Sequence, residues 1–175
     1  TRRSSDLYPN ITVDVIVGGR DLDRRLLNGE VQLAFMDAYG AQGFDWIPLF
    51  SSPLVAVLPK DDDRDTDKPV DIHELFGETF ISSPEQYVEL IFPEGRSHKR
   101  LMIDASDDAT IISMVASGLG VSVLSELSLR GYEQSVKTAP LKTPVGCELG
   151  IATRSVKSLT PAAKSFVSFA KKLKY

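Results

Sequence analysis

Apolar and polar positions alternate along this chain between two kinds of segment. Short runs of β-branched and other apolar residues predict strands, and apolar residues recurring every three or four positions predict helices. The predicted strands cover 11–17, 31–36, 53–59, 79–81, 100–103, 121–124 and 148–153. The predicted helices cover 20–28 and 71–76, a segment that Asp107 or Asp108 caps, and a last one that Thr160 and Pro161 open. Strands alternate with helices almost throughout, which defines the α/β class.

The first three segments form a strand–helix–strand unit. Residues 11–17 (ITVDVIV) and 31–36 (VQLAFM) are apolar enough to predict buried strands, and Asn28-Gly29 predicts the end of the helix between them. This order is typical of a parallel sheet. Residues 60–69 are polar and dense in charge, so we expect an exposed loop there.

Composition narrows the class of protein. The chain has 175 residues, of which 42% are hydrophobic and 25% charged, a balance typical of one globular domain or two small lobes. The formal net charge of −4 argues against a free-standing nucleic-acid binder, which would usually be basic.

One cysteine, Cys147, cannot form an internal disulfide, which favours a reducing compartment. No apolar run approaches the roughly 20 residues that span a bilayer, so no membrane partner is expected.

The sequence offers no catalytic machinery, and we predict that the chain is not an enzyme. A serine or cysteine nucleophile needs a neighbouring base, usually histidine. The two histidines, His73 and His98, lie in polar segments and are expected to be ordinary surface residues. No G-x-S-x-G motif is present, and His73-Glu74 would need a histidine at position 77, where Gly77 stands.

We also predict no metal and no cofactor. Asp61, Asp63 and Asp65 match the first positions of a calcium loop, but the glycine and glutamate that such a loop requires later are Thr66 and Ile72. The segment is better interpreted as a solvated loop. The glycines at 118 and 120 lack the third glycine of a dinucleotide fingerprint and end a helix instead of opening one.

Three strand-to-helix junctions remain as candidate ligand-binding sites. In open α/β sheets, ligands bind beyond the carboxyl ends of the strands, where helix N-termini favour negative charge. The candidate ligand-binding residues at these junctions are Gly18, Gly19, Arg20, Ser82, Ser83, Pro84, Ser106 and Asp107. The alternative is plain helix capping, since Ser83 and Gln86 fit a capping box. Arg20 could equally pair with Asp21 or Asp23 of its own helix.

Four stretches carry a resemblance to a known family. Residues 8–13 (YPNITV) are similar to a "YP-x-V-x-L" motif, and residues 26–34 (LLNGEVQLA) to "L-x-x-G-x-(L/V)-D-(L/V)-A", with Gln32 where Asp is usual. Residues 70–75 (VDIHEL) and 79–81 (TFI) are similar to "I-x-L-x-x-L … (P/W)-x-I". Residues 114–124 (MVASGLGVSVL) are similar to "M-V-A-x-G-x-G-(I/V)-x-(I/L)-L-P", with Ser125 in place of the proline. Together they resemble the effector-binding domain of LysR-type transcriptional regulators.

The resemblance implies a two-lobed fold like that of type 2 periplasmic binding proteins. Mixed, mostly parallel sheets with flanking helices would form two lobes joined by two crossover strands, near 53–59 and 148–153. Lobe I would hold 1–58 and 149–175, and lobe II would hold 59–148. A small polar or anionic effector would bind in the interlobe cleft, at the junctions given above.

The resemblance also implies a cellular setting. Members of the family are cytoplasmic bacterial regulators that act as homodimers or tetramers, and they bind DNA through a helix-turn-helix that this chain does not show. The family's opening strand, and a serine or threonine supplied beside it, are also missing from lobe I. The alternative is an extracytoplasmic solute-binding protein of the same fold. A helix-turn-helix in the upstream sequence would indicate the regulator, and a signal peptide the solute-binding protein.

Overall fold

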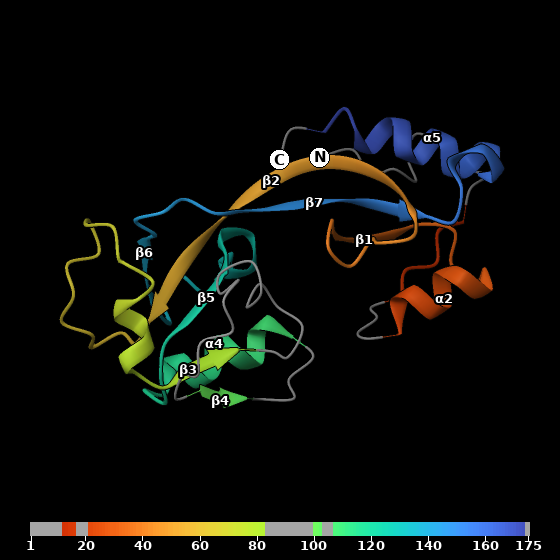
Figure 1. The fold of residues 1–175 in the computed structure, drawn as a ribbon. Helices are drawn as coiled ribbons and strands as arrows, with labels where there is room; N and C mark the ends of the chain where they lie inside the picture. Colours follow the sequence, from red (N-terminus) through yellow and green to blue (C-terminus); the bar gives the residue numbers. More distant parts are fainter. Residues whose placement is uncertain (1–11, 17–20, 83–99, 103–106, 174–175) are drawn as a thin grey trace. The chain divides into compact units, whose positions relative to one another are not determined.

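The chain folds into two compact units, shown in Figure 1. A computed structural model describes residues 12–16, 21–82, 100–102 and 107–173. Unit 1 comprises Thr1–Ser51 with Glu148–Tyr175, and unit 2 comprises Ser52–Cys147. Both boundaries fall inside strands, one in β2 (Asp45–Leu58) and one in β7 (Gly146–Thr153).

The described residues of unit 1 form a small sheet between two helices. Strand β1 (Ala34–Asp37) pairs antiparallel with β7, which also neighbours β2. Helix α2 (Leu22–Asn28) precedes β1, and α5 (Pro161–Ala170) follows β7 through the short 3-10 helix η3 (Val156–Ser158). Figure 1 shows α5 and α2 on opposite sides of this sheet.

Two apolar clusters hold these helices to the sheet. Adjacent residues of a strand point to opposite faces, and Ile151 and Ala152 of β7 accordingly belong to different clusters. The α5 cluster contains Ile47, Ile151, Leu159, Ala163, Val167 and Ala170. The α2 cluster contains Leu26, Ala34, Ala41 and Ala152. The sheet of unit 1 is therefore covered on both faces.

Unit 2 contains the second half of β2 and most of the short strands. Strand β2 pairs antiparallel with β5 (Ser122–Ser125) and β6 (Lys137–Pro140), while β3 (Phe80–Ser82) pairs parallel with β4 (Arg100–Met102). Helix α4 (Asp108–Ala116) and the 3-10 helices η1 (Glu74–Gly77) and η2 (Glu126–Leu129) complete it. The core consists of Val57, Ile81, Ile111, Ile112, Val115, Leu124, Leu129 and Val136.

Several predicted helix ends are confirmed by their capping geometry. Helix α2 ends at Gly29, whose φ of 75° is the left-handed conformation that glycine adopts easily. The Asp107 side chain caps α4, and the Thr160 hydroxyl accepts the Ala163 N–H at the start of α5, with Pro161 in its first turn. The loop over 60–69 contains no helix or strand, as predicted.

The prediction of a buried strand over 11–17 is wrong for the part that is described. Residues 12–16 carry no strand assignment and are exposed, with Val15 83% accessible. No described residue pairs with this segment, and an apolar run without a partner strand has nothing to be buried against.

Other differences concern strand limits and side-chain burial. The strand predicted over 31–36 starts only at Ala34, and β1 leaves Phe35 exposed because the described residues give it a neighbour, β7, on one side only. Strand β6 was not predicted, because KTAP shows no apolar run. Three leucines that follow the apolar spacing of the predicted helices are nevertheless exposed: Leu27, Leu119 and Leu173. Sheet pairing is mixed as predicted, but the predominance of parallel pairs is not confirmed.

Candidate functional site

Three strands of unit 2 end at a common edge. Strands β3 and β4 run parallel, with Ser82 opposite Met102. Strand β5 starts parallel to β3, because Ile81 N donates to Val121 O at 2.8 Å and Val121 N donates to Thr79 O at 2.9 Å. We call the ends of these strands, Ser82, Met102 and Ser125, the carboxyl edge of unit 2. In α/β sheets this is the edge where ligands bind.

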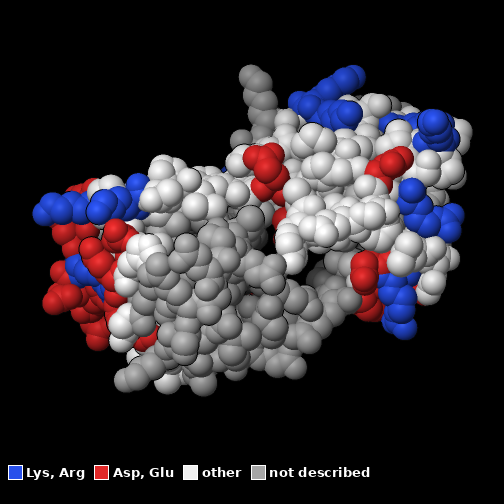
Figure 2. Space-filling model, viewed as in Figure 1, with Lys and Arg blue, Asp and Glu red and all other residues white. Residues whose placement is uncertain are grey.

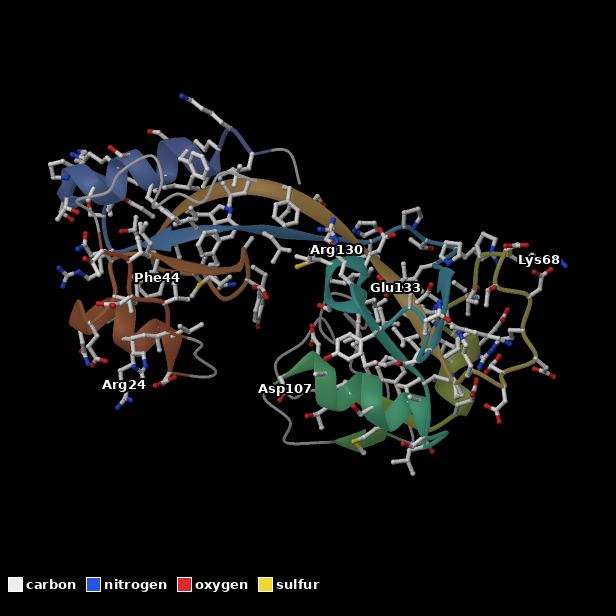
Figure 3. The ribbon with its side chains drawn as sticks, turned by 180° about the vertical axis from the view of Figure 1, so that it is seen from behind. Arg24, Phe44, Lys68, Asp107, Arg130 and Glu133 are labelled. Atoms are coloured by element: carbon white, nitrogen blue, oxygen red, sulfur yellow. The ribbon has the colours of Figure 1, made fainter. Side chains whose placement is uncertain are left out.

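Two predicted site residues, Ser82 and Asp107, are described, and both belong to this region. Ser82 is the last residue of β3 and is 5% exposed. Asp107 precedes α4, which packs on β3 through the core contacts of Ile111 and Ile112 with Ile81. Figure 3 shows Asp107 at the N-terminal end of α4.

Asp107 acts as a helix cap. Its Oδ1 accepts hydrogen bonds from Thr110 N at 2.8 Å and from Thr110 Oγ1 at 3.0 Å, and the side chain is exposed. The capping alternative is therefore realised at this junction. Capping occupies one carboxylate oxygen, and Asp107 together with Asp108 of the first turn already supplies negative charge to the N-terminal end of α4.

The remaining predicted site residues lie outside the described part of the chain: Gly18, Gly19, Arg20, Ser83, Pro84 and Ser106. The alternative in which Arg20 pairs with Asp21 also falls there. The Asp21 carboxylate does accept a hydrogen bond from Arg25 Nε at 2.7 Å, so it already has a basic partner on its own helix. This hydrogen bond holds the pKa of Asp21 below its ordinary value.

A pair of buried hydroxyls at the carboxyl edge was not predicted from the sequence. Ser125, at the end of β5, donates to Ser52 Oγ of β2 at 2.7 Å, and both side chains are buried. The backbone N–H of Leu127 donates to Ser52 Oγ at 3.2 Å and to Ser125 Oγ at 3.3 Å, so Ser125 also caps η2. The one available signal was Ser125 itself, a polar residue where the family motif has proline.

A further serine joins the two parallel strands. Ser122 is 1% exposed, and its Oγ donates to Ile81 O at 2.7 Å. This bond fully uses the hydroxyl hydrogen of Ser122 inside the sheet. The Ser122 hydroxyl therefore stabilises the sheet from within. The hydroxyls of Ser52 and Ser125, in contrast, lie at the carboxyl edge.

The acidic loop of unit 2 is organised by an arginine. Arg64 Nε donates to Asp62 Oδ1 at 2.8 Å, and Arg64 Nη1 donates to Glu78 Oε1 at 2.7 Å. The hydrogen bond from the Arg64 side chain to Asp62 holds the pKa of Asp62 below its usual range. Figure 2 shows acidic and basic side chains intermingled at the end of unit 2 that carries this loop. Among the described residues, no three His, Cys, Asp or Glu side chains gather as a metal site would need.

Comparison with known proteins identifies the family. The family model for the LysR substrate binding domain matches residues 2–174, and the chain therefore belongs to this family. It is thus an effector-binding domain of the LysR type. No helix among the described residues is long and apolar enough to cross a membrane.

Individual relatives agree with this assignment. The uncharacterized HTH-type transcriptional regulator YybE of Bacillus subtilis strain 168 is 27% identical over 171 residues, which are 93% of this chain and 58% of YybE. The chain thus spans a little over half the length of this relative. This relative is named as a transcriptional regulator of the helix-turn-helix type.

Solved structures show the same fold. The regulatory domain of Synechocystis PCC6803 CcmR, solved in complex with 2-PG, has a TM-score of 0.81 at 21% identity, covering 95% of this chain and 85% of that one. The effector binding domain of QuiR, in complex with shikimate, has a TM-score of 0.76 at 18% identity, covering 89% and 78%. The fold class predicted from the sequence, a LysR-type two-lobed α/β fold, is confirmed at this level.

Proposed function

We propose that the chain senses a small polar or anionic metabolite and reports its presence to a DNA-binding head of the same regulator. The observation that carries this proposal is the polar character of the carboxyl edge, where Ser82, Ser125 and Ser52 are buried, in a chain of the LysR family. Buried hydroxyls at such an edge supply directional hydrogen bonds without the cost of burying a charge.

The chemical class of the effector follows from the groups around this edge. Arg20 would add a cation, which favours an anionic group on the effector. The related domains of CcmR and QuiR were solved with 2-PG and shikimate. We propose that the effector contacts the residues of all three junctions: Gly18, Gly19, Arg20, Ser82, Ser83, Pro84, Ser106 and Asp107. We also propose that lobe I comprises 1–58 and 149–175, that lobe II comprises 59–148, and that the effector binds between them.

Signalling would proceed by a shift between conformational states. An effector changes an equilibrium only as far as it binds one state more tightly than the other. In a homodimer or tetramer, this preference would be transmitted to the DNA-binding heads, which act in the bacterial cytoplasm. The chain itself needs no catalytic residue for this role, and we propose that it has no enzymatic activity.

The test is a thermal-shift screen of small carboxylates, phosphates and sugar-like acids, including shikimate and 2-PG. A ligand that binds only the native state stabilises it by about 2.7 kcal/mol at a concentration 100 times its dissociation constant. We expect at least one compound to raise the melting temperature. The combined variant Ser83→Ala/Gly19→Val should lose this rise and keep the melting temperature of the unliganded protein.

A matched control makes the same kinds of change elsewhere. Ser168 is exposed on α5, and a Cβ at Gly77 would meet no atom within 4 Å. Ser168→Ala/Gly77→Val should therefore respond to the ligand like the parent. A response of the Ser83→Ala/Gly19→Val protein equal to that of the parent would show that the junctions are wrongly placed.

A further inference from the structure

The Ser52–Ser125 pair has more hydrogen-bond donors than the described residues around it have acceptors for. Each hydroxyl has one hydrogen to donate. One of the two hydrogens is used in the 2.7 Å bond between the two Oγ atoms. Leu127 supplies a donor, not an acceptor, to both oxygens. Whichever serine donates to the other, one hydroxyl hydrogen finds no acceptor among the described residues.

Burial makes this surplus hydrogen significant. Ser52 and Ser125 are 4% and 2% exposed, so bulk water does not solvate them freely. Buried hydroxyls nearly always find an acceptor, because leaving a donor unsatisfied is unfavourable. An acceptor other than the described residues is therefore needed to complete the hydrogen bonding of the pair.

The backbone does not require a serine at position 125. Its φ of −64° and ψ of 136° fall where proline is also comfortable, and proline is the residue of the family motif. The backbone conformation at this position therefore does not depend on the hydroxyl of Ser125. It lies at the carboxyl edge, in the strand next to β3, whose last residue, Ser82, is also buried.

We propose that the Ser52–Ser125 pair binds an acceptor oxygen of the effector, of the carboxylate or phosphate class. This inference rests on the proposed function, and it adds two contact residues and a chemical selection to it. A negatively charged oxygen forms the shorter and stronger bond with a hydroxyl donor. An ammonium group in the same place brings only further hydrogens and leaves the surplus donor unsatisfied.

The test compares binding by the parent protein and two variants, measured by isothermal titration calorimetry. The probes are shikimate, benzoate, succinate, 2-PG and inorganic phosphate, with benzylamine as the cationic counterpart of benzoate. Ser52→Ala/Ser125→Ala removes both hydroxyls. Its matched control is Ser122→Ala, which removes an equally buried hydroxyl whose hydrogen already has its acceptor in Ile81 O.

We expect the double variant to bind the best anionic probe about 10- to 100-fold more weakly, as for a lost hydrogen bond to a charged group. Ser122→Ala should keep the parent's affinity within about twofold while lowering the melting temperature, because its hydroxyl serves the sheet alone. Benzylamine should bind no better to the parent than to the double variant.

The outcomes separate this inference from the proposed function. Equal affinity of the parent and the double variant would overturn the inference alone and assign the surplus hydrogen to a buried water. Failure of the parent to bind any anionic probe would overturn the proposed function and this inference with it. If the double variant does not fold, a crystal structure of the unaltered chain with the best probe decides. A probe oxygen hydrogen-bonded to either serine supports the inference, and a water in its place refutes it.

Discussion

Arg64 shows how single residues decide the form of an acidic segment. Its side chain is 23% exposed and binds Asp62, whose side chain is 10% exposed, and Glu78. The backbone N–H of Arg64 also donates to Asp62 Oδ1 at 3.0 Å, so the turn and the ion pair share one carboxylate. Such a partly buried, multiply bonded pair stabilises a fold more than an exposed ion pair does.

We predict that Asp62→Asn lowers the free energy of unfolding by about 1–3 kcal/mol at pH 7. The folded pKa of Asp62 is lowered, first by the hydrogen bond from Arg64. Its contribution is therefore complete above the unfolded pKa of about 3.9 and is lost as the pH falls through the folded value. Urea unfolding at a series of pH values from neutral to acid measures this.

The exposed neighbour Asp63 provides the control for this prediction. Asp63→Asn should leave both the free energy of unfolding and its pH dependence close to those of the parent. The prediction would be wrong if Asp62→Asn and the parent lost the same stability on acidification, since the carboxylate would then contribute nothing that titrates.

At the scale of residues, local chemistry was predictable and distant partners were not. Asp107 and Thr160 were recognised as caps because a cap is defined by its own helix, a few positions away. Ser52 was not recognised, because its partner Ser125 lies 73 positions along the chain. A hydrogen bond between two unremarkable serines leaves no pattern in a single sequence.

The connection between α4 and β5 contains two glycines, and a different structural requirement favours glycine at each position. Gly118 has a φ of 75°, and a Cβ there would meet no atom within 4 Å. A Cβ on Gly120 would lie 2.2 Å from Thr79 O, a backbone atom of the segment that bonds to Val121. The first glycine serves a turn, and the second lets two backbones approach.

We predict that Gly118→Ala costs about 1 kcal/mol of unfolding free energy, the usual penalty of a left-handed alanine. Gly120→Ala should cost about 3 kcal/mol or more, because the β3–β5 pairing must open to admit the methyl group. Chemical denaturation of both variants checks the order. Gly77→Ala, at an open position, should be close to neutral. A smaller loss for Gly120→Ala than for Gly118→Ala would contradict the close approach.

At the scale of elements, the hydrophobic pattern identified the elements that have local support. Helix α4 was found near its true limits because cap, apolar stripe and stop signal agree, and the start of α5 was found from Thr160 and Pro161. Strand β2 was found only over its second part. Its first half, from Asp45 onward, contains Pro48, which interrupts the apolar run at 46–50 and argues against a strand when the sequence is considered alone. The strand prediction over 12–16 was wrong because a strand-like composition does not by itself provide a partner strand.

The two units, taken as whole bodies, have separate cores and opposite charge character. The clusters around α5 and α2 belong to unit 1, and the cluster around α4 belongs to unit 2. By sequence, unit 1 holds more basic than acidic residues and unit 2 more acidic than basic ones. The order of four motifs was enough to predict the fold of both, because family patterns record long-range packing that periodicity alone cannot.

The excess of basic residues in unit 1 and of acidic residues in unit 2 bears on whether this chain can bind DNA by itself. Unspecific binding to DNA depends on basic side chains that neutralise phosphates. The exposed lysines Lys164, Lys171 and Lys172 lie on α5 or just after it. Lys171 and Lys172 follow the last turn of α5, where a positive charge complements the helix dipole, so their position has a structural reason. The net charge of −4 opposes approach to a polyanion.

We therefore predict that the 175-residue chain binds duplex DNA no more tightly than about 10⁻⁴ M at physiological salt, the weak end of non-specific binding. Fluorescence anisotropy of a labelled duplex, repeated at several salt concentrations, measures this. Lys171→Glu/Lys172→Glu should give the same result as the parent, because these lysines are not expected to contact phosphates. Micromolar binding that weakens steeply with salt and disappears in this variant would instead reveal a phosphate-binding face on α5.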